Sequence, residues 1–366
     1  MLQTLAILII FLSCLFSAFL LTVPSKNRIG NYILATYLII RAIDTSSIFY
    51  NTYIEVTPIL DMIRYDIGAY FDAPLLYLFA LSIIYSDFKL KLGMILHAIP
   101  FFVAQLFLLP RFYIPFFNGL EADVYNTEGF VRFYIAVIQK LGYIVVIFFL
   151  LQKYKQILLQ NYSVIDKTNH SWLNWMNYVT LILLIAALTK NIYKWGEDSS
   201  YLWIFKFIVL LIMLYFTCWL VFKALFAPKI FTGISSKLQL VSSKGYHQEK
   251  NNEDASKINV LKVFMEEKKP FLNSELTINI LADQLDMAVN ELSELINQKL
   301  KKNFYEFITD YRIEEAESIF KNPNNSQLTV LEVMYDVGYN SKSSFNTSFK
   351  KKTGMTPTQY KSQFKG

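Results

Sequence analysis

Polar and basic side chains crowd the stretch DVGYNSKSSFNTSFKKKTGMTP, residues 336–357. At helical spacing, hydroxyl and amide groups can hydrogen-bond to base edges in the major groove of DNA, and lysines can pair with phosphates. Phe345 and Phe349 are four residues apart and should face the core of a helical domain. This register predicts that the helix exposes candidate DNA contacts at its start and along one side: Lys342, Ser343, Ser344, Asn346, Thr347, Lys350, Lys351 and Lys352.

Charge is unevenly distributed around this stretch. Residues 337–366 contain six lysines and no acidic residue, whereas residues 257–336 contain nine basic and fourteen acidic residues. A lysine cluster by itself is often only a solvated helix face. Beside a series of Ser, Asn and Thr it favours a phosphate-binding surface, which positions a protein on DNA without specifying sequence.

Turn residues define the elements that would hold this surface. Gly338 can adopt the positive φ that a tight turn requires, and Gly354 marks a second turn. Thr356 followed by Pro357 is typical of a capping residue and the first position of a helix. The pattern therefore predicts helices over 329–337, 342–353 and 357–363.

An earlier stretch has the same layout. We expect helices over 257–268, 277–286 and 290–300, and a long helix over 304–320 that separates the two helix pairs. Each pair has helix-turn-helix geometry, and two such units about 34 Å apart can read successive major grooves.

Individual residues support the expected helices and qualify the first unit. The pairs Asn303 with Glu306 and Thr329 with Glu332 have the spacing of capping boxes. Candidate DNA contacts in the first unit are Asn290, Ser293 and Asn297, although the neighbouring Glu291 and Glu294 would repel phosphates.

Residues 276–320 and 328–361 resemble the double helix-turn-helix domain of the AraC/XylS family of bacterial transcription regulators. The second part reproduces the family signature in order and spacing: Gly338-Tyr339, Ser344-Phe345, Phe349-Lys350, Gly354, Thr356-Pro357 and Tyr360. The chain departs from the family at Ala288, where a serine cap is frequent, at Lys301, where glycine is common, and at Met334, where a small residue is common. These departures weaken the expectation that the first unit reads bases, but not the expected fold.

The first 226 residues have a different character, since the chain is 54% hydrophobic overall and most of this apolarity lies here. Seven apolar stretches approach the roughly 20 residues that cross a bilayer. This half resembles, in architecture, the membrane sensor regions joined to this domain in regulators of Bacteroidetes type. We expect spans over 2–23, 31–49, 68–86, 92–110, 131–151, 172–192 and 201–226.

The expected fold is therefore all-α. A seven-transmembrane-helix bundle would occupy residues 1–226, a linker 227–256, and a seven-helix, AraC-type and homeodomain-like domain 257–366. Loops one, three and five carry seven Lys and Arg residues, against three in loops two, four and six. By the positive-inside rule the N-terminus lies outside and the C-terminal domain lies in the cytoplasm, at a bacterial inner membrane. The outer loops 50–67 and 111–130 are short and acidic, so a signal would be read within the helices or from lipid.

Several polar or ionisable residues fall inside the expected spans, where they are costly. Asp72 and Lys140 have no evident local partner and are candidate sensing residues, whereas Arg41 and Asp44, three residues apart, could neutralise each other. Pairing between helices is the structural alternative for the whole set. The set comprises Arg41, Asp44, Asp72, His97, Gln105, Lys140, Lys190 and Lys206.

These features indicate a one-component transcription regulator embedded in the lipid bilayer, with double-stranded promoter DNA, a second copy of the chain and an unidentified signal ligand as partners. RNA polymerase is a further candidate partner. We expect no catalysis, no cofactor and no metal, because nucleotide-binding, hydrolase and kinase motifs are absent and the three histidines lack metal spacing. The alternatives are a transporter or receptor with a regulatory, protein-binding tail, and a tail released by proteolysis within 242–256.

Overall fold

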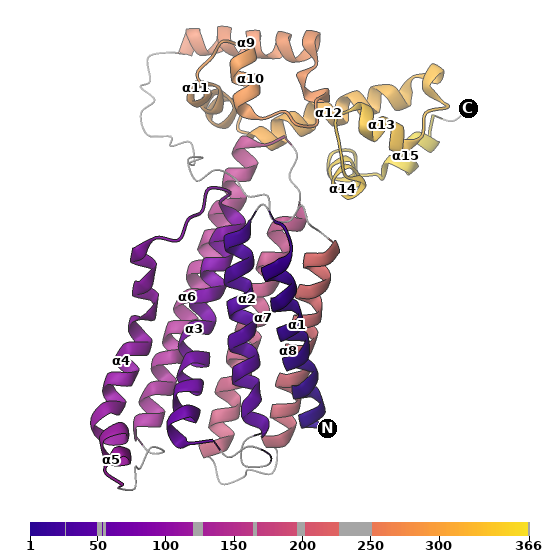
Figure 1. Ribbon diagram of the computed structural model, residues 1–366. Coiled ribbons are helices and arrows are strands. Elements are labelled where there is room, and N and C mark those ends of the chain that lie inside the picture. The colour runs from indigo at the N-terminus through magenta and orange to yellow at the C-terminus, as the bar shows by residue number, and fades with distance from the viewer. Residues whose placement is uncertain are drawn as a thin grey trace. The chain divides into compact units, whose positions relative to one another are not determined.

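The computed structural model describes residues 1–25, 27–49, 53, 56–119, 127–163, 167–195, 202–226 and 251–364. These residues form helices and no extended strand, which confirms the all-α expectation (Figure 1). The chain divides into two compact parts. The first part comprises residues 1–151 and 171–237, and the second part comprises 152–170 and 238–366.

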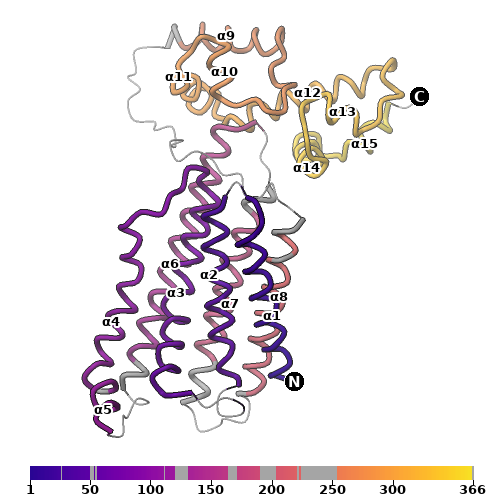
Figure 2. The backbone as a smooth tube through the Cα atoms, viewed as in Figure 1, coloured from indigo at the N-terminus to yellow at the C-terminus, as the bar shows by residue number. Residues whose placement is uncertain are grey.

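Six helices of the described chain are long and apolar enough to cross a membrane. In the first part α8 packs beside α1 through Ile9, Leu210 and Met213, although the two helices lie at opposite ends of this part of the sequence (Figure 2). The last ten residues of α6 belong to the second part. The six helices are α1 (Leu2–Thr22), α2 (Arg28–Thr45, continued by a 3-10 turn to Phe49), α3 (Pro58–Ile84), α6 (Thr127–Asn161), α7 (Lys167–Trp195) and α8 (Leu202–Phe226).

The expected seventh span, 92–110, is not one long helix. A 3-10 segment (Leu92–Ala98) leads into α4 (Ile99–Leu108), a π-helical turn (Leu109–Tyr113) and α5 (Ile114–Phe117). Pro100, Pro110 and Pro115 each occupy the first turn of one of these pieces. Proline has no N–H for the preceding turn, so each one favours a new start over continuation. The expectation of an unbroken span here is therefore wrong.

Helix α3 also begins earlier than expected, at Pro58 instead of residue 68. Thr57 is extended and Pro58 occupies the first turn, where its missing N–H has no cost. As a result Arg64 and Asp66, which the sequence placed in an outer loop, lie on this helix, and Asp66 is buried.

Residues 251–364 form seven α-helices. The first of them begins at Asn251, inside the expected linker; the rest of that linker, 227–250, lies outside the described residues, as does the expected cleavage region up to residue 250. The other boundaries differ from the expected ones by only a few residues. The helices are α9 (Asn251–Lys268), α10 (Ile278–Gln284), α11 (Val289–Glu294), α12 (Phe304–Lys321), α13 (Val330–Asp336), α14 (Lys342–Thr353) and α15 (Pro357–Ser362).

Helix α12 joins two hydrophobic cores. Phe304, Phe307 and Ile308 from its first half pack into the core of the first helix-turn-helix unit. Ile313 and Phe320 from its second half pack into the core of the second unit. Both expected capping boxes are present, with the Glu306 amide donating to Asn303 at 2.9 Å and the Glu332 amide donating to Thr329 at 3.1 Å. Side chains of the central helix α12 thus belong to the hydrophobic cores of both units.

Candidate nucleic-acid interface

Helix α14 turns its aromatic side toward the core. Phe345 and Phe349 are fully buried, and Phe349 contacts Phe320 and Tyr360 edge to face. This confirms the register expected from their spacing. The opposite side exposes Lys342, Ser343, Thr347, Lys350 and Lys351, with Asn346 half-buried at its edge.

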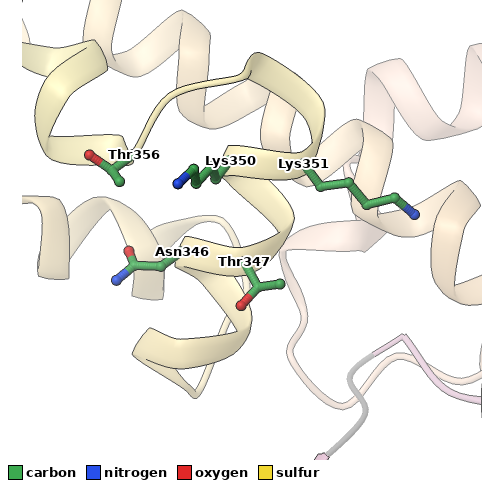
Figure 3. Close-up of a pocket in the computed structure, with 5 residues that line it drawn as sticks. All are labelled: Asn346, Thr347, Lys350, Lys351 and Thr356. Carbon is green, nitrogen blue, oxygen red and sulfur yellow. The ribbon is translucent and has the colours of Figure 1, made fainter.

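A shallow hollow of about 420 Å³ lies on this exposed side. Asn346, Thr347, Lys350 and Lys351 line it from α14, and Thr356 lines it from the cap of α15 (Figure 3). Figure 3 shows Asn346 and Lys350 directed toward the side of Thr356, whereas Lys351 extends away across the helix. Sequence reasoning identified Thr356 only as a cap, and nothing in its spacing signals that it lies beside Lys350.

Two of the expected contacts are buried. Ser344 is 5% exposed and Ser293 is 0% exposed, so the expectation that Ser344 lies on the exposed start of α14 is wrong. The buried side of α14 includes Ser344 and Ser348 as well as the two phenylalanines. The helix packs against both α12 and α13, so more of its surface is buried than the two phenylalanines cover. The Ser348 hydroxyl hydrogen-bonds with that of Tyr305 at 3.2 Å.

The lysines of the second unit fall into two groups. Lys352 Nζ pairs with Asp310 Oδ1 at 2.6 Å and with Glu314 Oε1 at 3.1 Å, and Lys361 donates to the Leu328 carbonyl. Lys342, Lys350 and Lys351 are exposed and have no carboxylate partner among the described residues. The side chain of Lys352 therefore stabilises the domain, and the other three lysines are available to phosphates.

Two glycines hold the turns that flank α14. Gly338 has φ 85°, and a Cβ there would lie 2.7 Å from the carbonyl oxygens of both Phe271 and Leu272. Gly354 has φ 79°, and a Cβ added there would meet no neighbouring atom. Gly338 is thus required both by its backbone conformation and by the close approach of the first unit, whereas Gly354 is required only by conformation. Pro357 is buried in the first turn of α15, as expected.

The first helix-turn-helix unit presents a weaker surface. Helix α11 has six residues and continues as a π-helical turn, and Ala288 provides no side-chain cap. Two ion pairs lie within this unit: Lys257 pairs with Glu291 at 2.6 Å, and Lys299 pairs with Asp254 at 3.0 Å.

The remaining residues that the sequence singled out are placed as follows. Asn290 is exposed, and Asn297 donates its amide to the buried Ser293 hydroxyl at 3.0 Å. Lys301 has φ 55°, which accounts for the glycine that the family resemblance places there. Met334 is buried in the second core, which accommodates its length.

Charged side chains of the apolar first part pair with one another. Lys140 Nζ lies in ion-pair contact with Asp72 Oδ2, and Arg41 lies 3.8 Å from Asp72 and 3.7 Å from Asp44. Asp72 and Lys140, which have no local partner in the sequence, thus have partners from other helices, because α2, α3 and α6 bring these residues together from distant parts of the sequence. The internal pairing of Arg41 with Asp44 is confirmed.

A second buried pair was missed. Asp66 contacts Arg132 and accepts a hydrogen bond from Gln105 at 2.7 Å, and both charged side chains are almost fully buried. The sequence did not indicate this pair, because Asp66 was assigned to a loop and Arg132 lay at the edge of an expected span. Structural pairing thus accounts for most of the charge within the described spans.

Metal-binding side chains do not gather in the part of the chain that the structure describes. No group of three or more His, Cys, Asp or Glu side chains there could hold an ion. The two cysteines are free thiols, Cys14 exposed and Cys218 half-buried.

The C-terminal part of the chain is similar to helix-turn-helix domains of transcription regulators. Residues 281–363 match the family model described as a helix-turn-helix domain, and this part of the chain is a DNA-binding domain of the AraC type. An uncharacterized HTH-type transcriptional regulator, YdeC of Bacillus subtilis (strain 168), is 30% identical over 87 residues, which cover 24% of this chain and 29% of that protein. The C-terminal domain of AraT, a response regulator from Geobacillus stearothermophilus, is 29% identical, with 29% of this chain and 84% of that chain covered and a TM-score of 0.26.

Proposed function

We propose that this protein is a membrane-embedded transcription regulator that binds promoter DNA mainly through α14. The observation that carries the proposal is the exposed face of α14, where three lysines without carboxylate partners among the described residues flank Asn346, Thr347 and Ser343. Lysines would hold the phosphates, and the amide and hydroxyl groups would meet base edges. The buried Ser293 and Ser344 have no place in this interface.

The apolar helices anchor this function at a membrane. Six described helices have the length and apolarity to span a bilayer. With the broken segment from Leu92 to Phe117 as a seventh crossing, the positive-inside bias of the loops supports a cytoplasmic C-terminal domain at the bacterial inner membrane. A green fluorescent protein fused after residue 366 should fluoresce, because this reporter does not mature after export. A fusion that fluoresces only weakly while alkaline phosphatase at the same position is active would reverse the orientation.

A dimer and a sensed signal complete the proposal. One copy of the chain with about four to eight phosphate contacts binds weakly at physiological salt, so two copies would be needed for firm binding. A signal read by the membrane helices would then alter the pairing or spacing of two C-terminal domains. RNA polymerase would be the partner through which bound protein changes transcription.

Selection from a genomic fragment library tests DNA binding directly. The full chain in nanodiscs should retain a small set of fragments, and Asn346→Ala and Lys350→Ala should weaken that binding. Lys262→Ala removes an exposed lysine from α9, outside the proposed interface, and serves as the matched control. Equal retention of all fragments by folded protein, or equal loss with all three variants, would contradict the proposal.

One observation favours the alternative. The broken segment from Leu92 to Phe117 is the kind of discontinuous helix that transporters use at their binding sites. If the folded full chain selects no DNA, a transporter or receptor with a protein-binding tail becomes the better account.

A further inference from the structure

A short segment that follows α6 is built into the second part of the chain, against the first helix-turn-helix unit. Tyr162 forms an isolated antiparallel bridge with Thr277, and the Ser163 amide donates to the Leu276 carbonyl at 3.2 Å. Ser163 is 1% exposed. This segment lies more than a hundred residues before α10 in the sequence, yet it pairs with the residues that lead into α10.

Arg312 of α12 receives this segment. Its guanidinium is fully buried with no carboxylate contact among the described residues, and it donates from Nη1 to the Ser163 carbonyl at 3.0 Å and from Nη2 to the Ser163 hydroxyl at 3.2 Å. Burial lowers the pKa of Arg312 to about 10. A buried cation needs its donors satisfied, so Ser163 supplies acceptors that the domain would otherwise have to replace with water.

The same guanidinium contacts both helix-turn-helix units. Nε donates to the Phe271 carbonyl at 2.7 Å and Nη2 to the Asn273 carbonyl at 2.8 Å, both just before α10. On its other side the guanidinium lies 5.5 Å from the ring centre of Tyr339, in the turn of the second unit. Arg312 therefore lies where the two units meet, and Ser163 is hydrogen-bonded at that junction.

We propose that residues 162–163 form a docking strap, and that the Leu276–Thr277 edge together with Arg312 is its receptor. Docking would fix the orientation of the first unit relative to α14. The main role of the first unit would then be to bind the strap, and contact with DNA bases would be secondary. Two observations support this division. Charged side chains on and beside α11 form the Lys257–Glu291 and Lys299–Asp254 ion pairs, and the strap follows directly on α6, which continues from a candidate membrane span.

Disulfide trapping tests the docking without reference to DNA. Tyr162→Cys and Thr277→Cys, in a chain with Cys14→Ser and Cys218→Ser, place two thiols directly across the bridge at a separation suited to a disulfide. A protease site inserted within 242–250 lets a non-reducing gel show whether the two fragments stay joined. The control pair is Tyr162→Cys with Thr358→Cys, an exposed position on α15.

The outcomes of the trapping experiment in membranes are distinct. We expect the 162–277 pair to form at least about five times more cross-linked product than the control pair, because disulfides require close and aligned Cβ atoms. Ser163→Pro removes the amide that donates to Leu276 and should lower the yield, and Ser163→Ala, which removes only the hydroxyl acceptor of Arg312, should lower it less. Lys262→Ala, at an exposed position on α9, is the control and should leave the yield unchanged. Equal yields for the two pairs would overturn the docking.

The effect of docking on DNA rests on the proposed function and is measured separately. In nanodiscs, Ser163→Pro should bind the selected DNA at least about threefold more weakly than the wild type, and the control Lys262→Ala should bind within about twofold of it. Equal affinity of Ser163→Pro and wild type would overturn the regulatory role. Failure of the wild type itself to bind DNA would instead count against the proposed function, and the cross-linking result would stand.

Discussion

Lys352 Nζ lies 2.6 Å from Asp310 Oδ1, so one lysine of the proposed DNA-binding helix is bound to the central helix α12. Lys350, two residues earlier, has no such partner among the described residues. The two side chains carry the same charge on the same helix, but only one is available to a phosphate. Lys350 is therefore expected to contribute to DNA binding, and Lys352 to the stability of the domain.

Replacement of these two lysines should have different effects. Lys350→Ala should weaken DNA binding about fivefold at moderate salt and reduce the slope of log K against log salt by about 1, because one phosphate contact is lost. Lys352→Ala should leave that slope unchanged and cost about 0.5 kcal/mol of stability, since its ion pairs are partly exposed. Binding titrations over a salt series measure both slopes. The same loss of slope in both variants would show that Lys352 also reaches DNA.

The Asp310 contacts predict a loss of stability in acid. Burial tends to raise the pKa of Asp310, but hydrogen bonds from Lys302 and Lys352 outweigh burial and hold the pKa below its ordinary value near 3.8. A carboxylate with a lowered pKa in the folded state stabilises the fold above its unfolded-state pKa and loses that contribution as the pH falls through the folded-state pKa. The second unit should therefore lose stability below about pH 4.

Asp310→Asn tests the assignment of that acid effect. Hydrogen exchange of the α12 amides in the full chain should be faster in the variant than in the wild type at about pH 6, and the difference should shrink toward about pH 3. Asp283→Asn, at an exposed position on α10, is the control and should match the wild type at both pH values. A difference between Asp310→Asn and wild type that stays constant with pH would contradict the role of this carboxylate.

The two turn glycines should tolerate alanine unequally. Gly338→Ala adds a Cβ that meets two carbonyl oxygens at 2.7 Å, on top of its positive φ, and should destabilise the second unit by about 3 kcal/mol. Gly354→Ala meets no neighbour and should cost only about 1 kcal/mol of backbone strain. Hydrogen exchange of α13 and α14 amides ranks the two variants. Similar exchange rates would show that the first unit can move away from Gly338 at little cost.

The pairing of Asp72 with Lys140 predicts how the membrane half responds to charge removal. Asp72→Asn alone leaves the mostly buried Lys140 without its carboxylate and should lower the amount of folded protein in membranes, with a cost of about 3 kcal/mol. Lys140→Met alone leaves Asp72 with Arg41 as a partner at 3.8 Å and should cost less. The double variant removes both charges and should recover much of that loss. Size-exclusion profiles of detergent-solubilised protein measure the folded fraction.

A transcription reporter distinguishes a structural role of the Asp72–Lys140 pair from a role in signal sensing. If the double variant folds and still regulates a target promoter like the wild type, the pair is structural. Normal folding with lost regulation would instead place Asp72 and Lys140 in signal detection.

Local patterns in the sequence were enough to predict the helical class, the apolar half, the helix-turn-helix domain and the register of α14. These follow from local rules, since Phe345 and Phe349 recur at helical spacing, Gly338 allows a positive φ, and Asn303 and Thr329 cap helices through residues three positions away. The same locality explains why boundaries in the C-terminal domain were close to those observed.

Which charged side chains have ion-pair partners depends on tertiary contacts. Lys352 and Lys350 look alike in sequence, and Asp72 and Lys140 look unpaired, because their partners lie tens of residues away and are brought close only by helix packing. The burial of Ser293 and Ser344, the broken segment after Leu92 and the docking of Ser163 on Arg312 depend in the same way on contacts that no local pattern records.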